Sequence, residues 1–279
     1  MYLKKRLEML GLGILICFSF ILTEKTSTMI KDNDEIMTSI KERQLEFEYD
    51  SVDAKIVNDE IIPGISGKII DIEESYQAMK QVGIYKDNLM VFKYISPAIS
   101  INDNYDKYIV SGNTSKKQVS IIFKIDNDQN IDNIVNILNN KEIPANFFVN
   151  YEWSKNNVDT IKNISTKGHV IGKLESNKDT AQLLQSIIKI NTSQKQYYCY
   201  SEEKNEELLN NCSNNKEYTI LPSLVIDNSL LSNVMNNIKS GSIISITVNK
   251  YTLKELSNTV DYINSKGFKI VNLDVLLEE

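Results

Sequence analysis

Few residues in this chain of 279 can carry out acid–base or nucleophilic chemistry. His169 is the only histidine, and the cysteines are Cys17, Cys199 and Cys212. A site that needs two imidazoles from one chain is therefore excluded. The sequence has no Gly-x-Ser-x-Gly motif, and neither a serine triad nor a Cys199 nucleophile could form without His169 as its base.

Asp126 and Asp128, followed by Asn130, have the spacing that opens a calcium-binding loop. Such a loop needs glycine at its sixth position and glutamate at its twelfth, where this chain has Ile131 and Ile137. We therefore interpret this segment as a solvated turn.

The N-terminus is predicted to be a targeting segment, residues 1–24. Lys4, Lys5 and Arg6 precede an uncharged, largely apolar run at residues 9–23. This run is longer than a typical secretory core but shorter than the roughly 20 residues of a membrane span, and no small-residue cleavage site follows it. The pattern favours an uncleaved signal anchor over a cleaved signal peptide. We expect a single-pass protein of the cell membrane with its bulk extracytoplasmic, the alternative being a secreted protein.

Composition excludes one large class of partner. Lys and Arg number 31 against 37 Asp and Glu, which gives a net charge of −6 and a pI near 5.1. Binding to a phosphate backbone requires the opposite charge, so nucleic acid is not an expected partner.

Beyond the membrane, Cys199 and Cys212 form an even pair that could close a disulfide. Two buried free thiols are the alternative in an anaerobic cell. If closed, a loop this short would stabilise the fold by on the order of 3 kcal/mol.

The remainder divides into three predicted segments. Residues 25–60 are charged and polar and contain no Gly or Pro, which is typical of a stalk. Residues 61–116 would form a small N-terminal subdomain, in which Asp71 begins a short helix that Gly83 ends. Residues 117–279 alternate apolar runs with amphipathic stretches, the pattern of successive βα units on a parallel sheet.

Seven strands are predicted in this C-terminal segment, and seven βα units in about 160 residues indicate an incomplete α/β barrel. An open doubly wound sheet is the alternative, although the chain lacks a glycine-rich phosphate loop. The strands are placed at 119–123, 145–149, 169–171, 196–200, 218–221, 242–248 and 268–272.

Several motifs in these units resemble the polysaccharide deacetylase (NodB-homology) family. The resemblance covers roughly residues 117–279 and implies a distorted (β/α)7 barrel that acts on N-acetylated cell-wall or capsular glycans. Its motifs are Gln118-Val119-Ser120-Ile121-Ile122-Phe123, Ile143-Pro144-Ala145-Asn146-Phe147-Phe148-Val149, Trp153, Lys167-Gly168-His169-Val170-Ile171-Gly172, Gly241-Ser242-Ile243-Ile244 and Ser265-Lys266-Gly267-Phe268.

The resemblance also implies a divalent metal such as zinc, held by one Asp and two His, with a second Asp as general base and a further His as general acid. Here each of those positions is altered, so we expect no metal cofactor and no intact catalytic group. His169 matches a structural histidine of the family. The altered catalytic positions are Lys124, Ile125, Tyr200 and Thr247, of which Lys124 stands at the general base and Ile125 at the metal-binding Asp. Leu174 and Lys178 stand at the metal-binding histidines.

The leading hypothesis is a catalytically inactive, membrane-anchored protein that binds envelope glycan or scaffolds an envelope protein. Lys124, Lys178, Tyr200 and Thr247 are the candidate ligand-binding residues, and the two lysines would favour anionic groups. One alternative is an active carbohydrate N-deacetylase with a rearranged site that uses Asp126 or Asp128 as base. Another is a purely structural barrel in which the helix that begins at Asp71 belongs to the working part.

Overall fold

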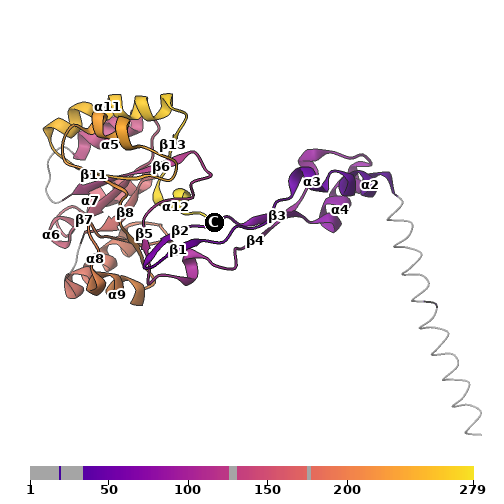
Figure 1. The fold of residues 1–279 in the computed structure, drawn as a ribbon, viewed down its shortest axis with the longest axis horizontal. Coiled ribbons are helices and arrows are strands. Elements are labelled where there is room, and N and C mark those ends of the chain that lie inside the picture. The colour runs from indigo at the N-terminus through magenta and orange to yellow at the C-terminus, as the bar shows by residue number, and fades with distance from the viewer. Residues whose placement is uncertain (1–18, 20–33, 126–130, 175–176) are drawn as a thin grey trace, which may run out of the picture. The chain divides into compact units, whose positions relative to one another are not determined.

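The computed structural model describes residues 19, 34–125, 131–174 and 177–279 (Figure 1). The chain divides into two compact units, one comprising Met1–Ser51 and Ser66–Ile95 and the other Val52–Ile65 and Ser96–Glu279. The predicted membrane segment at 9–23 lies outside the described residues, except for Ser19. Among the described residues, none forms a helix that is long and apolar enough to cross a membrane.

In its described residues, the N-terminal unit packs three α-helices with a two-stranded antiparallel sheet. The helix α4 (Ile72–Val82) begins and ends as predicted, because the Asp71 side chain accepts from the backbone of Glu74 and Gly83 adopts a left-handed conformation with φ of 79°. The buried core of the N-terminal unit consists of Ile36, Met37, Ile40, Ile70, Tyr76, Met79 and Met90. The other elements are α2 (Glu35–Glu42), α3 (Gln44–Phe47), β3 (Gly67–Ile70), the 3-10 turn η1 (Asp87–Leu89) and β4 (Phe92–Ile95).

The predicted boundaries in this half of the chain need correction. Part of the expected polar stalk at 25–60 is folded, since α2 contributes three side chains to the core of the N-terminal unit. Residues 52–65 belong to the other unit, and the expected subdomain at 61–116 is split between the two. The physical reason is that Ile36, Met37 and Ile40 lie on one helical face whose partners come from α4 and Met90, far along the chain.

The C-terminal unit is built on one curled, largely parallel sheet in the order β1-β2-β5-β10-β9-β8-β7-β6-β12-β11, with β13 also pairing with β6. Only the β1–β2 pair is antiparallel. The strands β6 to β10 lie side by side in chain order, so the chain winds in one direction, as in a barrel and unlike a doubly wound sheet. The path has two end strands, β1 and β11, so the sheet is a curled half-barrel. The strands are β1 (Lys55–Val57), β2 (Glu60–Ile62), β5 (Tyr108–Ile109), β6 (Gln118–Ile125), β7 (Asn146–Val149), β8 (Val170–Lys173), β9 (Tyr198–Tyr200), β10 (Tyr218–Ile220), β11 (Leu224–Ile226), β12 (Ile243–Thr247) and β13 (Lys269–Ile270).

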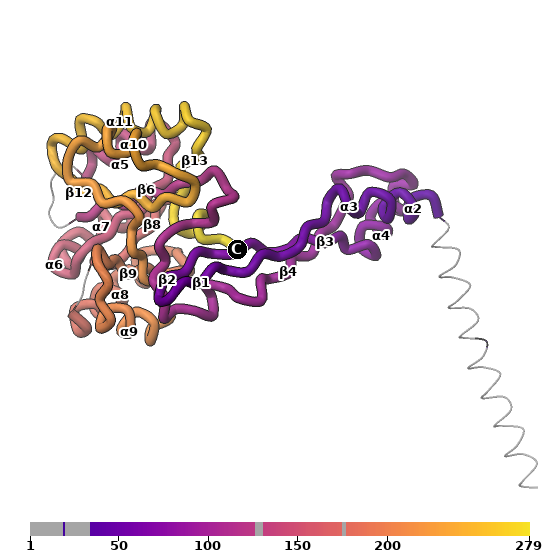
Figure 2. The backbone as a smooth tube through the Cα atoms, viewed as in Figure 1, coloured from indigo at the N-terminus to yellow at the C-terminus, as the bar shows by residue number. Residues whose placement is uncertain are grey.

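Helices cover the outer face of this sheet, and α5 and α11 lie side by side on it (Figures 1 and 2). They are α5 (Ile131–Asn140), α6 (Tyr151–Ser154), α7 (Val158–Thr166), α8 (Lys178–Asn191), α9 (Glu206–Asn214), α10 (Leu230–Asn237), α11 (Lys250–Ser265) and α12 (Leu273–Leu276), with the 3-10 turn η2 (Ile101–Asp103).

Alternation along β6 explains why the unit has two apolar layers. Ile121, Phe123 and Ile125 point outward into a core shared with the helices, whereas Ile122 points inward to a second core. The inner core is filled mainly by rings and branched side chains, including Phe148 and Tyr200. Lys124 shares the inner face with Ile122, so the sequence places a cation at the carboxyl-terminal end of β6 on the concave side of the sheet.

All seven predicted strands overlap an observed strand. The prediction missed β11 in the C-terminal segment, and it also missed β1, β2 and β5, which the chain supplies from residues assigned to the stalk and subdomain.

Candidate functional site

Three of the residues predicted to line the barrel mouth do meet at the carboxyl-terminal ends of the strands. Lys124 on β6 is the register partner of Thr247 on β12. The Lys124 ammonium lies 3.2 Å from a carboxylate oxygen of Glu202 and 5.8 Å from the centre of the Tyr200 ring. Glu202 lies two residues beyond the end of β9 and was not among the predicted site residues.

Tyr200 is a packing residue at this site and not an exposed platform. Its side chain is 8% exposed, its hydroxyl lies 2.8 Å from Ser245 Oγ, and its ring meets Phe148 edge-on at 5.7 Å between centres. Burial raises the pKa of Tyr200 to about 12, so the phenol remains protonated at neutral pH. Tyr200 can therefore donate a hydrogen bond but cannot act as a base.

The other rim of the mouth is polar and carries a carboxylate. The Thr247 hydroxyl donates to Asp227 Oδ1, and the Asn249 amide donates to the Asp227 carbonyl at 2.8 Å. Asp227 is exposed. Together with Lys124 and Glu202, these groups give the described part of the mouth two carboxylates and one ammonium.

Three predicted site residues lie elsewhere. Ile125 is 1% exposed and belongs to the outer core, because it is one strand position from the concave face. Leu174 packs against the inner core. Lys178 is exposed at the first position of α8 and lines a small cavity with Lys173 and Glu217.

The expectation that two lysines create an anion-favouring mouth is therefore not supported by the geometry. Lys124 already pairs with Glu202, and Lys178 belongs to a different cavity. Asp126 and Asp128, the candidate bases of an alternative active site and of the calcium-loop spacing, lie outside the described residues.

His169 serves a structural purpose at the opposite ends of the strands. It precedes β8, is 4% exposed, and its Nδ1 accepts a hydrogen bond from the Ala145 backbone at 3.1 Å. Because Nδ1 accepts, the ring proton lies on Nε2. Burial, aided by the nearby Lys167 charge, lowers the pKa of His169 to about 4, so the imidazole is neutral at physiological pH.

The residues at the former metal positions do not fit the divalent metal that the family uses. Such a site needs carboxylate and imidazole donors, whereas Ile125 and Leu174 offer only hydrocarbon and Lys178 an ammonium. The Lys124 charge beside them would also repel a dication. No catalytic step through a metal is therefore derived at this mouth.

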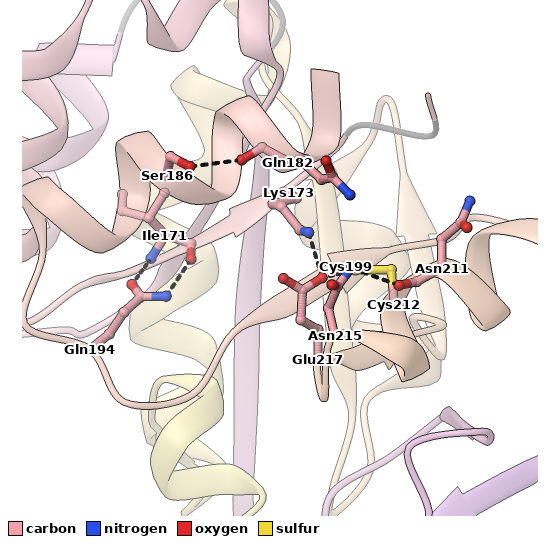
Figure 3. Close-up of polar contacts among 10 residues, drawn as sticks. All are labelled: Ile171, Lys173, Gln182, Ser186, Gln194, Cys199, Asn211, Cys212, Asn215 and Glu217. Carbon is pink, nitrogen blue, oxygen red and sulfur yellow. Dashed lines mark hydrogen bonds and ion pairs between the residues drawn. A yellow bond between two sulfur atoms is a disulfide. The ribbon is translucent and has the colours of Figure 1, made fainter. Parts of the chain in front are cut away.

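A second polar cluster, which the sequence analysis did not identify as a site, lies among β8, β9 and α9 (Figure 3). Cys199 on β9 and Cys212 on α9 form a disulfide, so the structure selects the first of the two predicted alternatives for this pair. Lys173 and Glu217 form an ion pair beside it and are 3% and 1% exposed. Two features of the sequence could have indicated this cluster: Lys173 lies within the apolar strand β8, and Glu217 directly precedes β10.

Comparison with known proteins agrees with this fold. Residues 111–225 match the sequence profile of the polysaccharide deacetylase family. These residues of the C-terminal unit are therefore polysaccharide-deacetylase-like (NodB-homology) in sequence, which confirms the resemblance predicted from the motifs. The family's catalytic and metal-binding residues are absent from the positions compared above, so the domain is a degenerate one.

Individual relatives extend the fold similarity. The structure of BA3943 from Bacillus anthracis, described as a CE4 family pseudoenzyme, has a TM-score of 0.67 and 24% identity and covers 88% of this chain and 96% of that one. A BA3943 mutant described as having restored enzymatic activity matches with the same TM-score and identity, over 88% of this chain and 99% of that one. PdaA of Bacillus subtilis, a family 4 carbohydrate esterase, has a TM-score of 0.55 and 16% identity, and the match covers 62% of this chain and 86% of that one.

In sequence, the chain is 28% identical over 151 residues to the uncharacterized protein YlxY of Bacillus subtilis (strain 168). That match covers 53% of this chain and 47% of YlxY, so it spans about half the length of that relative.

Proposed function

We propose that this protein is a non-catalytic, polysaccharide-deacetylase-like binding protein of the cell envelope. The single observation that carries the proposal is the state of the mouth: Lys124 stands where the family has its general base and is held by Glu202 over the Tyr200 ring. An ammonium in an ion pair has no free lone pair with which to take a proton from water. Lys124, Tyr200 and Thr247 are each paired with a neighbouring polar residue.

The ligand class follows from the groups that remain. Glu202 and Asp227 offer carboxylate acceptors for sugar hydroxyls, and Lys124 offers a donor that can reach a carbonyl. Two carboxylates around one ammonium disfavour a polyanion. We therefore propose a neutral, N-acetylated glycan as ligand in place of an anionic one.

The location is also a proposal. The basic N-terminus and the apolar run at 9–23 would anchor the chain in the membrane with the domain outside, where such glycans are found. An envelope protein that docks at the same mouth is the remaining alternative partner.

The test uses the full chain with N-acetylated chitooligosaccharides and peptidoglycan fragments as probes. We expect saturable binding by calorimetry with no acetate released, even with zinc added. The double variant Lys124→Ala/Glu202→Ala should bind at least tenfold more weakly, because it removes a donor and an acceptor together.

The matched control is Lys141→Ala/Asp261→Ala, which removes an exposed ion pair. In this pair the ammonium of Lys141, just after α5, lies 2.6 Å from a carboxylate oxygen of Asp261 on α11. It should bind like the unmodified chain. Acetate release that a chelator abolishes would overturn the claim of inactivity, and the absence of binding to every acetylated glycan would overturn the ligand class.

A further inference from the structure

The disulfide cluster has an electrostatic arrangement that goes beyond a structural cross-link. The Cα atoms of Cys199 and Cys212 are 6.5 Å apart, and the two side chains are 0% and 3% exposed. Glu217 Oε2 contacts Cys199 Sγ at 3.3 Å and also accepts from the Lys173 ammonium (Figure 3). A disulfide sulfur has no proton to donate, so only Lys173 satisfies this carboxylate oxygen.

The second oxygen of Glu217 is buried and has no hydrogen-bond partner among the described residues. A small cavity of about 10 Å³ adjoins it, lined by Lys173, Cys212, Asn211, Asn215 and Glu217, among others. This is close to the space that one water molecule or one ion requires. A buried carboxylate oxygen without a partner is costly, and it marks a place where a ligand would be favoured.

The donor atoms are also close enough to share one ion. Both sulfurs and a Glu217 oxygen lie within 4.8 Å of one another. In a tetrahedral zinc site with Zn–S distances near 2.3 Å, the sulfurs stand about 3.8 Å apart. Breaking the disulfide would let the sulfurs separate to that distance without moving β9 far from α9.

Charge balance distinguishes the two redox states. With the disulfide closed, the cluster holds one carboxylate and one ammonium, which cancel, so a dication would be uncompensated in a buried site. With both cysteines present as thiolates, the same cluster carries two excess negative charges, which a single Zn²⁺ neutralises.

We propose that reduction of Cys199–Cys212 converts this cluster into a buried zinc site, with the two thiolates and the Glu217 carboxylate as ligands and a water in the adjoining cavity as the fourth. A dithiol reductant supplies two electrons and two protons, so that the S–S bond becomes two thiols and the reductant becomes its own disulfide. Binding of Zn²⁺ then releases two protons to solvent. An external disulfide then reverses the step by thiol–disulfide exchange: it accepts two electrons and two protons to become two thiols, the Cys199–Cys212 bond forms again, and the loss of both thiolate ligands releases the ion.

This site is independent of the mouth and of the glycan proposed to bind there. It uses none of the residues at the family's metal positions, and its ligands come from β9, α9 and the residue before β10. The Lys173 ammonium offsets one of the three negative charges of the ligands, so the net charge of the reduced cluster matches a single dication.

The experiment uses the full chain carrying Cys17→Ser, so that only two cysteines remain. One sample is kept oxidised; the other is reduced with dithiothreitol, freed of reductant without oxygen, and shown to hold two free thiols and a native circular dichroism spectrum. Both are dialysed against zinc chloride, and the bound metal is measured. We expect one zinc per reduced chain and none per oxidised chain.

Cobalt provides a second measurement, since thiolate ligation gives a charge-transfer absorption that carboxylate binding does not. Glu217→Gln should weaken zinc binding at least tenfold, and Glu207→Gln, which alters an exposed residue at the first turn of α9, should not. If Glu217→Gln fails to fold because Lys173 is left unpaired, Lys173→Met/Glu217→Gln replaces it.

Three results would overturn the proposal: a reduced chain without zinc, zinc binding that persists after Cys199→Ser/Cys212→Ser, or a disulfide that is reduced only when the chain unfolds.

Discussion

At the scale of single residues, the side chains at the mouth of the sheet are held by their neighbours. Lys124 occupies a strand end on the concave side and Tyr200 lies beside it; Glu202 pairs with the first and Ser245 with the second.

His169 provides a pH-dependent prediction. Its pKa is about 4 in the folded chain and near 6.5 when unfolded, so the unfolded state binds the proton more strongly. The stability that the neutral ring provides is complete above pH 6.5 and is lost as the pH falls towards 4, by about 3 kcal/mol in all. Urea unfolding at several pH values should show this loss.

The control for that prediction is His169→Gln, which keeps a polar group near the Ala145 N–H but does not titrate. It should be less stable than the unmodified chain at pH 7, and the gap should narrow as the pH falls. Since the chain has one histidine, a gap that is constant between pH 7 and 4 would show that His169 is not buried as described.

Gly172 provides a packing prediction. It pairs with Phe148 across β7 and β8, and a Cβ at this position would overlap the Phe148 ring, which is fully buried. Gly172→Ala should destabilise the fold by about 1–3 kcal/mol, because the ring has no free space to move into. Urea unfolding of Gly172→Ala and Gly172→Ala/Phe148→Leu measures the effect of this overlap. The double variant should recover part of the lost unfolding free energy. A single variant as stable as the unmodified chain would contradict the predicted clash.

At the scale of elements, local signals were sufficient where a segment carries its own boundary. The helix α4 was predicted from Asp71 to Gly83 because both caps are encoded in neighbouring residues. Six of the seven predicted strands, β6 to β10 and β12, were predicted because their apolar runs are buried on both faces. β1 could not be predicted in this way, since all three of its residues are exposed and its place depends on pairing with β2.

The candidate site also shows that local sequence signals do not predict features that depend on tertiary packing. Motif order placed Lys124, Tyr200 and Thr247 together correctly, because the ends of parallel strands converge. Lys178 was misplaced because its position depends on where α8 begins, which is a matter of tertiary packing. The Lys173–Glu217 pair joins residues 44 positions apart, and no local pattern links them.

The capping of α11 allows a prediction at this scale. Asn249 Oδ1 accepts from the backbones of Tyr251 and Thr252, and the Thr252 hydroxyl accepts from Asn249 N–H, which is a capping box. Asn249→Ala should cost about 1 kcal/mol of unfolding free energy, because two backbone donors lose their partner. Asn249→Asp keeps that acceptor and should cost less. Urea unfolding compares the two, and equal losses would assign the effect to the Asn249–Asp227 hydrogen bond instead.

At the scale of the whole molecule, the core of the N-terminal unit shares no residue with the outer and inner cores of the C-terminal unit. The chain passes between the units at 51/52, 65/66 and 95/96, so neither unit is one continuous segment. This explains why a division into consecutive segments could not describe it: the apolar positions of α2 find their partners beyond residue 69, after an excursion through the other unit.

Separate cores predict separate responses to cavity formation. Met79 is fully buried in the core of the N-terminal unit, and Met79→Ala should destabilise that unit by about 2–5 kcal/mol. Hydrogen exchange should then accelerate in residues 35–47 and 67–95 while β6 and β7 keep their protection, because their contacts lie in other clusters. Ile161→Ala, a fully buried residue of the outer core, is the matched control and should give the opposite distribution. If either variant accelerated exchange equally in both units, the two units would have to unfold as one cooperative structure.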